Sequence, residues 1–133
     1  MTDRVTTKYA ASIAAAGKCL DDFMAAFNAR DLKAWEATFN FPSLRLAAGK
    51  LVTIDKPGWH PADTFERGAL KDWHHSAWQR RKVIHAGAGK VHFDTCFARY
   101  RADGSVIGQF DSIYIVTFDD GHWGVKLRSS FAP

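Results

Sequence analysis

Residues whose side chains can bind a ligand or move a proton gather in the second half of the chain. Thr95, Ser112 and Ser129 form a line of hydroxyl groups across three predicted strands, and Tyr114 adds a phenol close to Ser112. A phenol can donate a hydrogen bond to a carbonyl or to a developing oxyanion. His74 is a second candidate, because an imidazole can act as a general base at neutral pH. The predicted catalytic residues are therefore Tyr114 and His74.

Three antiparallel strands must position these side chains: Lys90–Arg101, Val106–Asp119 and His122–Phe131. The pairs Asp103-Gly104 and Asp120-Gly121 separate the strands, and Asp-Gly pairs favour two-residue hairpin turns. Counting outward from these turns places aromatic and aliphatic residues opposite one another, which indicates the buried face of a sheet. The expected partners are Phe97 with Phe110, Thr95 with Ser112, Phe93 with Tyr114, Phe110 with Phe131, Ser112 with Ser129, Tyr114 with Leu127, Val116 with Val125 and Phe118 with Trp123.

This face is expected to form the floor of a small-molecule pocket. A large aromatic area gives affinity by burial, and a few polar atoms orient the ligand. Arg99 lies near the end of the sheet and can reach over the pocket rim to an anionic ligand, or else extend into solvent. The alternative is a closed core in which the hydroxyl groups bond to the backbone. The predicted ligand-binding residues are Trp35, Phe39, Trp73, Thr95, Arg99, Phe110, Ser112 and Ser129.

The opposite face of the sheet is expected to form a homodimer interface. It combines charged side chains with Ile113, Ile115 and Tyr100, which a purely solvated face rarely carries together. An isologous contact between two copies is the common way to cover such a face. The ion pairs expected beside it join Lys126 and Arg128 to Asp94 or Asp111.

The first half of the chain predicts three helices packed on the concave face of a curved, mainly antiparallel sheet. Apolar residues recur every three or four positions after Thr6 or Thr7, which can cap the first helix, and Asp31 can cap the second. A two-residue turn at Ala88-Gly89 would place His85 opposite His92 on the outer face. The expected elements are a helix to Asn28, a helix Leu32–Phe39 ended by Pro42, a hairpin of Leu44–Ala47 with Lys50–Ile54, a helix Ala62–Gln79 that buries Leu70, Trp73, His74 and Ala77, and a strand Lys82–Gly87.

Length and composition predict one domain, residues 1–133, with a substantial core. Of the 133 residues, 47% are hydrophobic and 14% aromatic, and the net charge of +4 is scattered, with no nucleic-acid-binding motif. Cys19 and Cys96 have no paired spacing, which is typical of a reducing compartment. No apolar run reaches the roughly 20 residues of a membrane span. We expect a cytoplasmic protein that binds no nucleic acid or membrane.

The sequence contains no pattern for a cofactor or a metal ion. It has no glycine-rich phosphate loop, no nucleophile elbow and no zinc-ligand spacing. His74 and His75 are adjacent, and adjacent residues of the expected helix point about 100° apart, so they are poor ligands for one ion. No cofactor and no metal are therefore expected.

The order of elements, together with Phe27-Asn28-Ala29-Arg30-Asp31 followed by Trp35 and Phe39, resembles the NTF2-like superfamily, especially its SnoaL-like and ketosteroid-isomerase-like branches. The resemblance covers nearly the whole chain. It implies a cone with an apolar pocket at its wide end and dimerisation through the outer face of the sheet. Members include isomerases, dehydratases, cyclases, epoxide hydrolases and non-enzymatic binders, so the fold alone leaves function open.

The catalytic residues of the ketosteroid isomerase are mostly missing when they are carried over by this resemblance. Its general-base aspartate falls in the stretch 44–47, which has no carboxylate. Its first oxyanion donor falls at about Phe23, which has no donor, and its second falls near Tyr114. Three functions stay open: acid/base chemistry of the isomerase, dehydratase or hydratase type on a small apolar carbonyl- or hydroxyl-bearing compound, binding of such a compound without turnover, and an interaction domain with a filled core.

Overall fold

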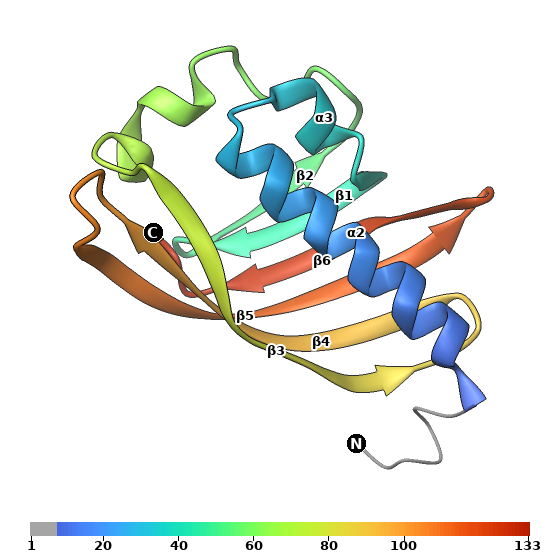
Figure 1. The fold of residues 1–133 in the computed structure, drawn as a ribbon. Coiled ribbons are helices and arrows are strands. Elements are labelled where there is room, and N and C mark those ends of the chain that lie inside the picture. The colour runs from blue at the N-terminus through green and yellow to red at the C-terminus, as the bar shows by residue number, and fades with distance from the viewer. Residues whose placement is uncertain (1–7) are drawn as a thin grey trace.

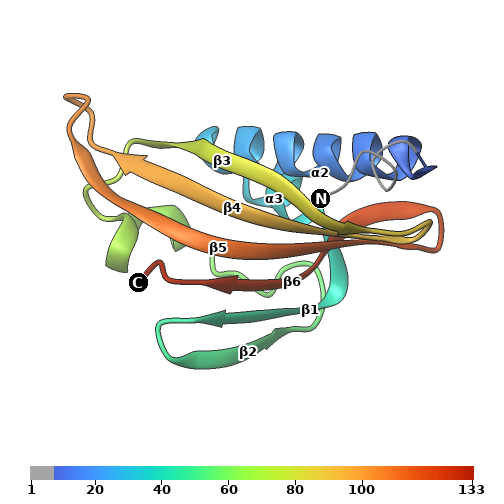
Figure 2. The same cartoon turned by 90° about the horizontal axis from the view of Figure 1, so that it is seen from below.

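A six-stranded curved sheet wraps around two helices in this computed structural model, which describes residues 8–133 (Figures 1 and 2). The strand order is β2-β1-β6-β5-β4-β3, and neighbours are antiparallel except β1 and β6, which are parallel. The elements are α2 (Ala10–Asn28), α3 (Leu32–Glu36), β1 (Phe39–Ala47), β2 (Lys50–Ile54), β3 (His75–Ala86), β4 (Lys90–Tyr100), β5 (Val106–Asp119) and β6 (His122–Ser130).

Helix α2 lies across the concave face of the sheet and forms one side of the core (Figure 1). It contacts β3, β4, β5 and β6, and its buried residues follow the predicted apolar stripe. Leu20 has no exposed surface, and Phe23 packs against Trp35, Phe39 and Tyr114 with ring centroids 5.5 to 5.8 Å apart. The expected cap at Thr6 or Thr7 lies outside the described residues.

The stretch after α2 ties the helices to the start of β3. Asp31 caps α3 as predicted, and its Oδ1 accepts a hydrogen bond from the Ala34 N–H at 3.0 Å. The Asn28 side chain bonds both the N–H and the carbonyl of Ser76, at 2.8 and 2.9 Å. The Arg30 guanidinium donates to the carbonyls of Trp73 and His74. The polar residues that follow the first helix therefore anchor the start of β3 by hydrogen bonds.

The expected third helix is wrong. Residues 62–79 form two short 3₁₀ turns, η1 (Thr64–Glu66) and η2 (Gly68–Leu70), and then enter β3 at His75. Gly68 has φ +61°, which breaks a right-handed helix, and the bonds from Asn28 hold Ser76 in an extended pairing. The two N-terminal helices are thus confirmed, but α3 ends at Glu36, and Pro42 lies within β1, where the ladder to β6 is interrupted.

The three C-terminal strands are confirmed as consecutive and antiparallel. Across β4 and β5 the observed partners match those predicted, including Thr95 opposite Ser112 and Phe97 opposite Phe110. The turn at Asp120-Gly121 has positive φ at both residues, as a two-residue type I′ hairpin requires, and His85 lies opposite His92. Between β4 and β5 the turn is longer than predicted, because the strands stop at Tyr100 and resume at Val106.

A β-bulge at Lys126 overturns the predicted register of β6. Val116 pairs with Val125, but Ile115 pairs with Leu127, so one extra residue is inserted. An inserted residue moves every later side chain to the other face of the sheet. Arg128 and Ser130 therefore lie on the concave face, and Leu127 and Ser129 on the outer face. Phe131, which was expected inside, is 83% exposed.

The charges on the outer face pair differently from the prediction. The Arg80 Nη2 lies 3.0 Å from carboxylate oxygens of both Asp94 and Asp111, and Lys126 pairs with Asp119. Arg128 takes no part because the bulge turns it inward. The homodimer itself stays a prediction.

Within residues 8–133 there is no helix with the length and apolar character needed to cross a membrane.

Candidate functional site

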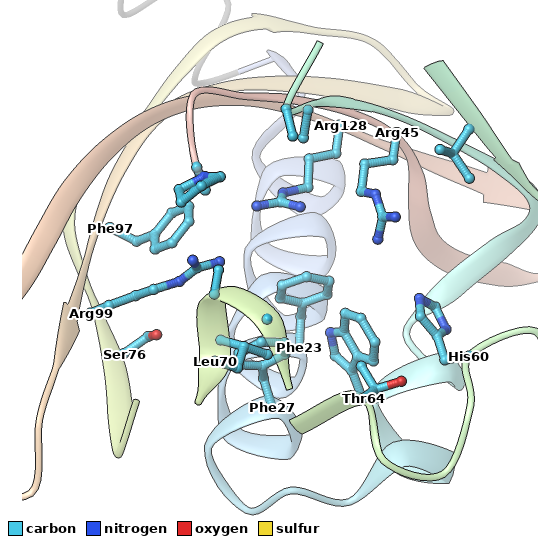
Figure 3. Close-up of a pocket in the computed structure, with 18 of the residues that line it drawn as sticks. Phe23, Phe27, Arg45, His60, Thr64, Leu70, Ser76, Phe97, Arg99 and Arg128 are labelled. Carbon is cyan, nitrogen blue, oxygen red and sulfur yellow. The ribbon is translucent and has the colours of Figure 1, made fainter. Parts of the chain in front are cut away.

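A pocket of about 410 Å³ opens between the concave face of the sheet, α2 and the η1–η2 segment (Figure 3). Side chains from both helices, all six strands and the last residues of the chain line it. Phe23, Phe27 and Leu70 form an apolar side, and arginines point in from the sheet. The volume is within the range of ordinary small-ligand sites. The chain therefore forms an open pocket and not a fully closed core.

Three arginines enter this pocket from three strands of the sheet: Arg45 from β1, Arg99 from β4 and Arg128 from β6 (Figure 3). Arg99 is only 7% exposed, and Arg45 and Arg128 are half-buried. Among residues 8–133, no carboxylate lies within salt-bridge distance of any of the three. In the part of the chain that the structure describes, the pocket lining contains Lys50 and Arg67 as well, but no Asp or Glu. The site is therefore strongly cationic.

Burial makes these positive charges costly. It lowers the pKa of Arg99 to about 10, and the charge of Arg128 acts in the same direction. Burial also lowers the pKa of Arg45, again with a contribution from Arg128. Figure 3 shows Arg128 between the other two arginines. The Nε atoms of Arg99 and Arg128 are buried and have no hydrogen-bond partner in the described part of the chain. A buried polar group without a partner calls for an explanation, such as an absent ligand.

Aromatic rings and one hydroxyl group hold the arginines in place. The Arg99 guanidinium lies over the rings of Phe97 and Phe110, 5.6 and 5.2 Å from their centroids. The Arg128 guanidinium lies 5.7 Å from the Tyr114 ring centroid, and its Nη2 donates to the Ser130 Oγ at 3.2 Å. Such contacts orient a guanidinium without neutralising its charge. The cationic groups are therefore positioned before any ligand binds.

A buried acid–histidine pair lies at another part of the pocket wall. Glu36 is at the end of α3, and His60 lies between β2 and η1. The Glu36 Oε2 lies 2.5 Å from the His60 Nδ1, and both side chains are at most 6% exposed. Hydrogen bonds from the Gly58 N–H and from His60 outweigh the effect of burial and lower the pKa of Glu36. His60 lines the pocket, whereas Glu36 supports it from behind.

The structure brings only part of the predicted site together. Tyr114, Trp35 and Arg99 line the pocket, and Phe39 lines a separate space of about 20 Å³. His74 is exposed on the loop before β3, because the helix expected to turn it inward does not form. His74 and Tyr114 therefore do not share a site.

The remaining predicted residues support the pocket without lining it. The Thr95 Oγ1 donates to the Ser112 carbonyl at 3.0 Å, and the Ser112 Oγ bonds the Ser130 Oγ at 2.7 Å. The row of hydroxyl groups is thus Thr95, Ser112 and Ser130, and Ser129 faces outward. Trp73 is buried and donates to the Ser76 Oγ, and Phe110 packs beneath Arg99.

Arg45, Arg128, Glu36 and His60 were missed as site residues. Arg45 alternates with Leu44 and Leu46 in β1, and this alternation alone does not show which face of the strand is the inner one. Leu46 is 48% exposed, whereas Ser43, on the same face as Arg45, is buried. Glu36 and His60 are 24 positions apart, and no spacing rule joins them.

The fold and site together define an α+β protein with a curved six-stranded sheet of the cystatin-like type and a pocket on its concave side. The sequence model of the family DUF6841, described as an NTF2-like protein, matches residues 14–127. That match covers most of the chain, so the protein belongs to this NTF2-like family. No curated protein matches the chain.

Solved structures support the same fold. An NTF2-like protein of unknown function from Pseudomonas putida KT2440 has a TM-score of 0.74 and 13% identity, over 93% of this chain and 88% of that one. A ketosteroid isomerase-like protein from Erwinia carotovora atroseptica SCRI1043 has a TM-score of 0.65 and 15% identity, over 89% and 93%. A cystatin-like protein of unknown function from Nostoc punctiforme PCC 73102 has a TM-score of 0.68 and 10% identity, over 90% of each chain. At these identities the likeness shows the fold alone.

Proposed function

We propose that this protein binds a small organic anion with an apolar body. The observation that carries the proposal is the group of three arginines, Arg45, Arg99 and Arg128, which enter one pocket and have no carboxylate within salt-bridge distance among residues 8–133. A buried charge is normally paired, because removing it from water is costly. A guanidinium presents planar N–H donors that match a carboxylate or phosphate. The pocket thus provides a counter-charge site for a ligand.

The apolar side of the pocket favours a ligand that is more than a simple ion. Phe23, Phe27 and Leu70 face the arginines across the cavity (Figure 3). Inorganic phosphate or sulfate would leave this surface uncovered, whereas an aryl or branched aliphatic body would bury it. The ligand expected from the sequence was a small apolar compound bearing a carbonyl or hydroxyl group. The arginines favour one that also carries a negative charge.

Binding without turnover is the better supported of the two pocket functions. The acid/base alternative relied on Tyr114 and His74, and His74 is exposed outside the pocket. Tyr114 remains in the lining, where a phenol next to Arg99 can donate a hydrogen bond to an anion. The proposal therefore assigns Tyr114 to ligand orientation.

Matched probes that differ in charge test this function. Phenylacetate and phenyl phosphate are compared with the uncharged phenylacetamide by calorimetric titration at pH 7.5 and low salt. We expect the anions to bind at least tenfold more tightly than the amide, since charge-assisted hydrogen bonds are worth about 1.5–3 kcal/mol. Added salt should weaken the binding of the anions and leave the binding of the amide unchanged.

Two variants show where the anion binds. Arg128→Met should remove the preference for the anions over the amide. Arg80→Met is the matched control, because Arg80 lies on the outer face and pairs with Asp94 and Asp111. Equal binding of phenylacetate and phenylacetamide, or loss of binding in the Arg80 variant alone, would contradict the proposal.

A further inference from the structure

The pair of Glu36 and His60 is arranged so that one imidazole nitrogen is left for a ligand. The Glu36 Oε1 accepts from the Gly58 N–H at 2.7 Å, and its Oε2 accepts from the His60 N–H at 3.2 Å and contacts the His60 Nδ1 at 2.5 Å. These bonds fix the carboxylate in one orientation. Since an ionised carboxylate can only accept hydrogen bonds, the His60 Nδ1 must carry a proton.

The other ring nitrogen, Nε2, is then an acceptor without a donor. A neutral imidazole protonated at Nδ1 has its lone pair at Nε2. Burial, assisted by the positive charge of Arg45, outweighs Glu36 and lowers the pKa of His60, so the ring is neutral at pH 7. In residues 8–133 the Nε2 atom is buried and has no hydrogen-bond partner. A buried acceptor of this kind is satisfied in most proteins, by protein, water or ligand.

The location of His60 links this acceptor to the pocket. Figure 3 shows the His60 ring at one end of the pocket, close to Arg45, and Arg99 at the opposite end, with Arg128 between them. The ring packs on Trp35 with centroids 4.5 Å apart, and Phe39 and Trp59 enclose it further. Glu36 and Arg45 are the charged groups that act on it. A ligand held by Arg99 and Arg128 would therefore extend toward His60.

We propose that His60, held in one tautomer by Glu36, accepts a hydrogen bond from a hydroxyl or N–H group at the far end of the bound anion. The ligand class becomes an organic anion with a second, uncharged donor, such as a hydroxyaryl carboxylate. This inference rests on the proposed anion site. A site built around a buried polar group discriminates strongly against analogues that leave it unpaired.

Ligands that differ only in this donor test the inference. Phenylacetate, 3- and 4-hydroxyphenylacetate and their two methoxy counterparts are titrated into the full chain at pH 7.5. One hydroxy isomer should bind about five- to tenfold more tightly than phenylacetate, as expected for one added hydrogen bond. Its methoxy counterpart should not, because a methoxy group has no proton to donate.

Two variants separate the acceptor from its support. His60→Phe keeps a ring in the wall and should bind phenylacetate as before, while losing the preference for the hydroxy isomer. Glu36→Gln can donate its own amide proton to Nδ1, which allows Nε2 to carry the imidazole proton, so the preference should fall. In the wild type, the preference should also disappear at acid pH, because an imidazolium has no lone pair to accept with. This last measurement needs no variant to fold.

The outcomes distinguish the two proposals. If anions bind more tightly than the amide but neither hydroxy isomer exceeds phenylacetate, His60 is not the acceptor and the anion site stands. If a methoxy compound binds as tightly as its hydroxy counterpart, the effect is one of size and the inference is wrong. If phenylacetate binds no better than phenylacetamide, the anion site fails and the acceptor proposal fails with it.

Discussion

Replacing Arg99 by methionine should make the protein more stable while it loses its ligand. Arg99 is 7% exposed, and burial is the main cause that lowers its pKa from the ordinary value of an arginine to about 10. A shift of that size corresponds to about 3 kcal/mol of unfavourable free energy for the charged form in the folded state. Contacts with Phe97 and Phe110 return about 1 kcal/mol. Methionine keeps a long apolar stem and removes the charge, so the net gain should be about 2 kcal/mol.

Urea unfolding of wild type and Arg99→Met at pH 7 measures this gain directly. For a chain of this length, 2 kcal/mol corresponds to a rise in melting temperature of about 8 °C. The ligand experiment should give the opposite result, with phenylacetate no longer binding better than phenylacetamide. Arg80→Met is again the control and should show neither change, because its guanidinium is exposed and paired.

The pH dependence provides a second check with a defined sign. Because the pKa of Arg99 is lower in the folded state than in the unfolded state, the folded protein releases this proton first as pH rises. The unfolded state then binds more protons, so wild type should gain stability relative to Arg99→Met above about pH 10. If Arg99→Met is instead less stable than wild type by 1 kcal/mol or more at pH 7, the guanidinium holds the fold together and our reasoning about an unpaired charge is refuted.

Three further predictions concern other parts of the fold. Gly124→Ala should lower stability by about 1–3 kcal/mol in urea unfolding, because a Cβ at this position would lie 2.7 Å from the Asn40 backbone nitrogen; an unchanged midpoint would contradict the close packing of β1 and β6. Cys19 should not react with a thiol reagent in the folded protein at pH 8, since burial raises its pKa to about 12, and rapid labelling of a Cys96→Ser variant would disprove this. The fold lowers the pKa of Glu36, so the carboxylate stabilises the protein above its unfolded pKa of about 4.3, and this stability is lost as pH falls through the folded value. The stability of Glu36→Gln should therefore vary less with pH below 5 than that of wild type. Identical acid profiles would show that the carboxylate contributes nothing.

The sheet could be predicted from the sequence because its signals are local. Asp120-Gly121 defines a two-residue turn, and the pairing from Val116 outward follows by counting. The first half of the chain is harder, because helix and extended loop share similar spacings of apolar residues. Leu70 and Trp73 recur at a helical interval, yet they belong to a 3₁₀ turn and a loop anchored by hydrogen bonds from Arg30. Long-range hydrogen bonds determine the conformation of this region, and the spacing of residues in the sequence does not reveal them.

The pocket was partly predictable for the same reason. Tyr114 and Arg99 lie on strands whose register was correct, so their faces were correct. The prediction for His74 was wrong because its inward position depended on a helix that does not form. His60 and Glu36 meet through the loop that follows β2, and an acidic residue next to Trp35 in a short helix gives no sign of burial. Pocket residues on β4 and β5 could be identified because the register of these strands was predicted correctly. Arg45 on β1, Arg128 beyond the bulge in β6, and the pair of Glu36 and His60 could not.

The bulge at Lys126 limits what alignments with distant relatives can say about this pocket. The final strand of a relative without this bulge can be aligned with β6 in two ways. With a gap of one position, Arg128 is matched to a residue on the same face of the sheet. Without the gap, Arg128 is matched to a residue on the opposite face. At 10–15% identity the score hardly separates these two choices. Without the gap, Leu127 and Ser129 would be assigned to the cavity and a cationic site would be recorded as an apolar one. Transfer of ligand preference between members of this fold must therefore compare strand register in three dimensions before it compares residue types.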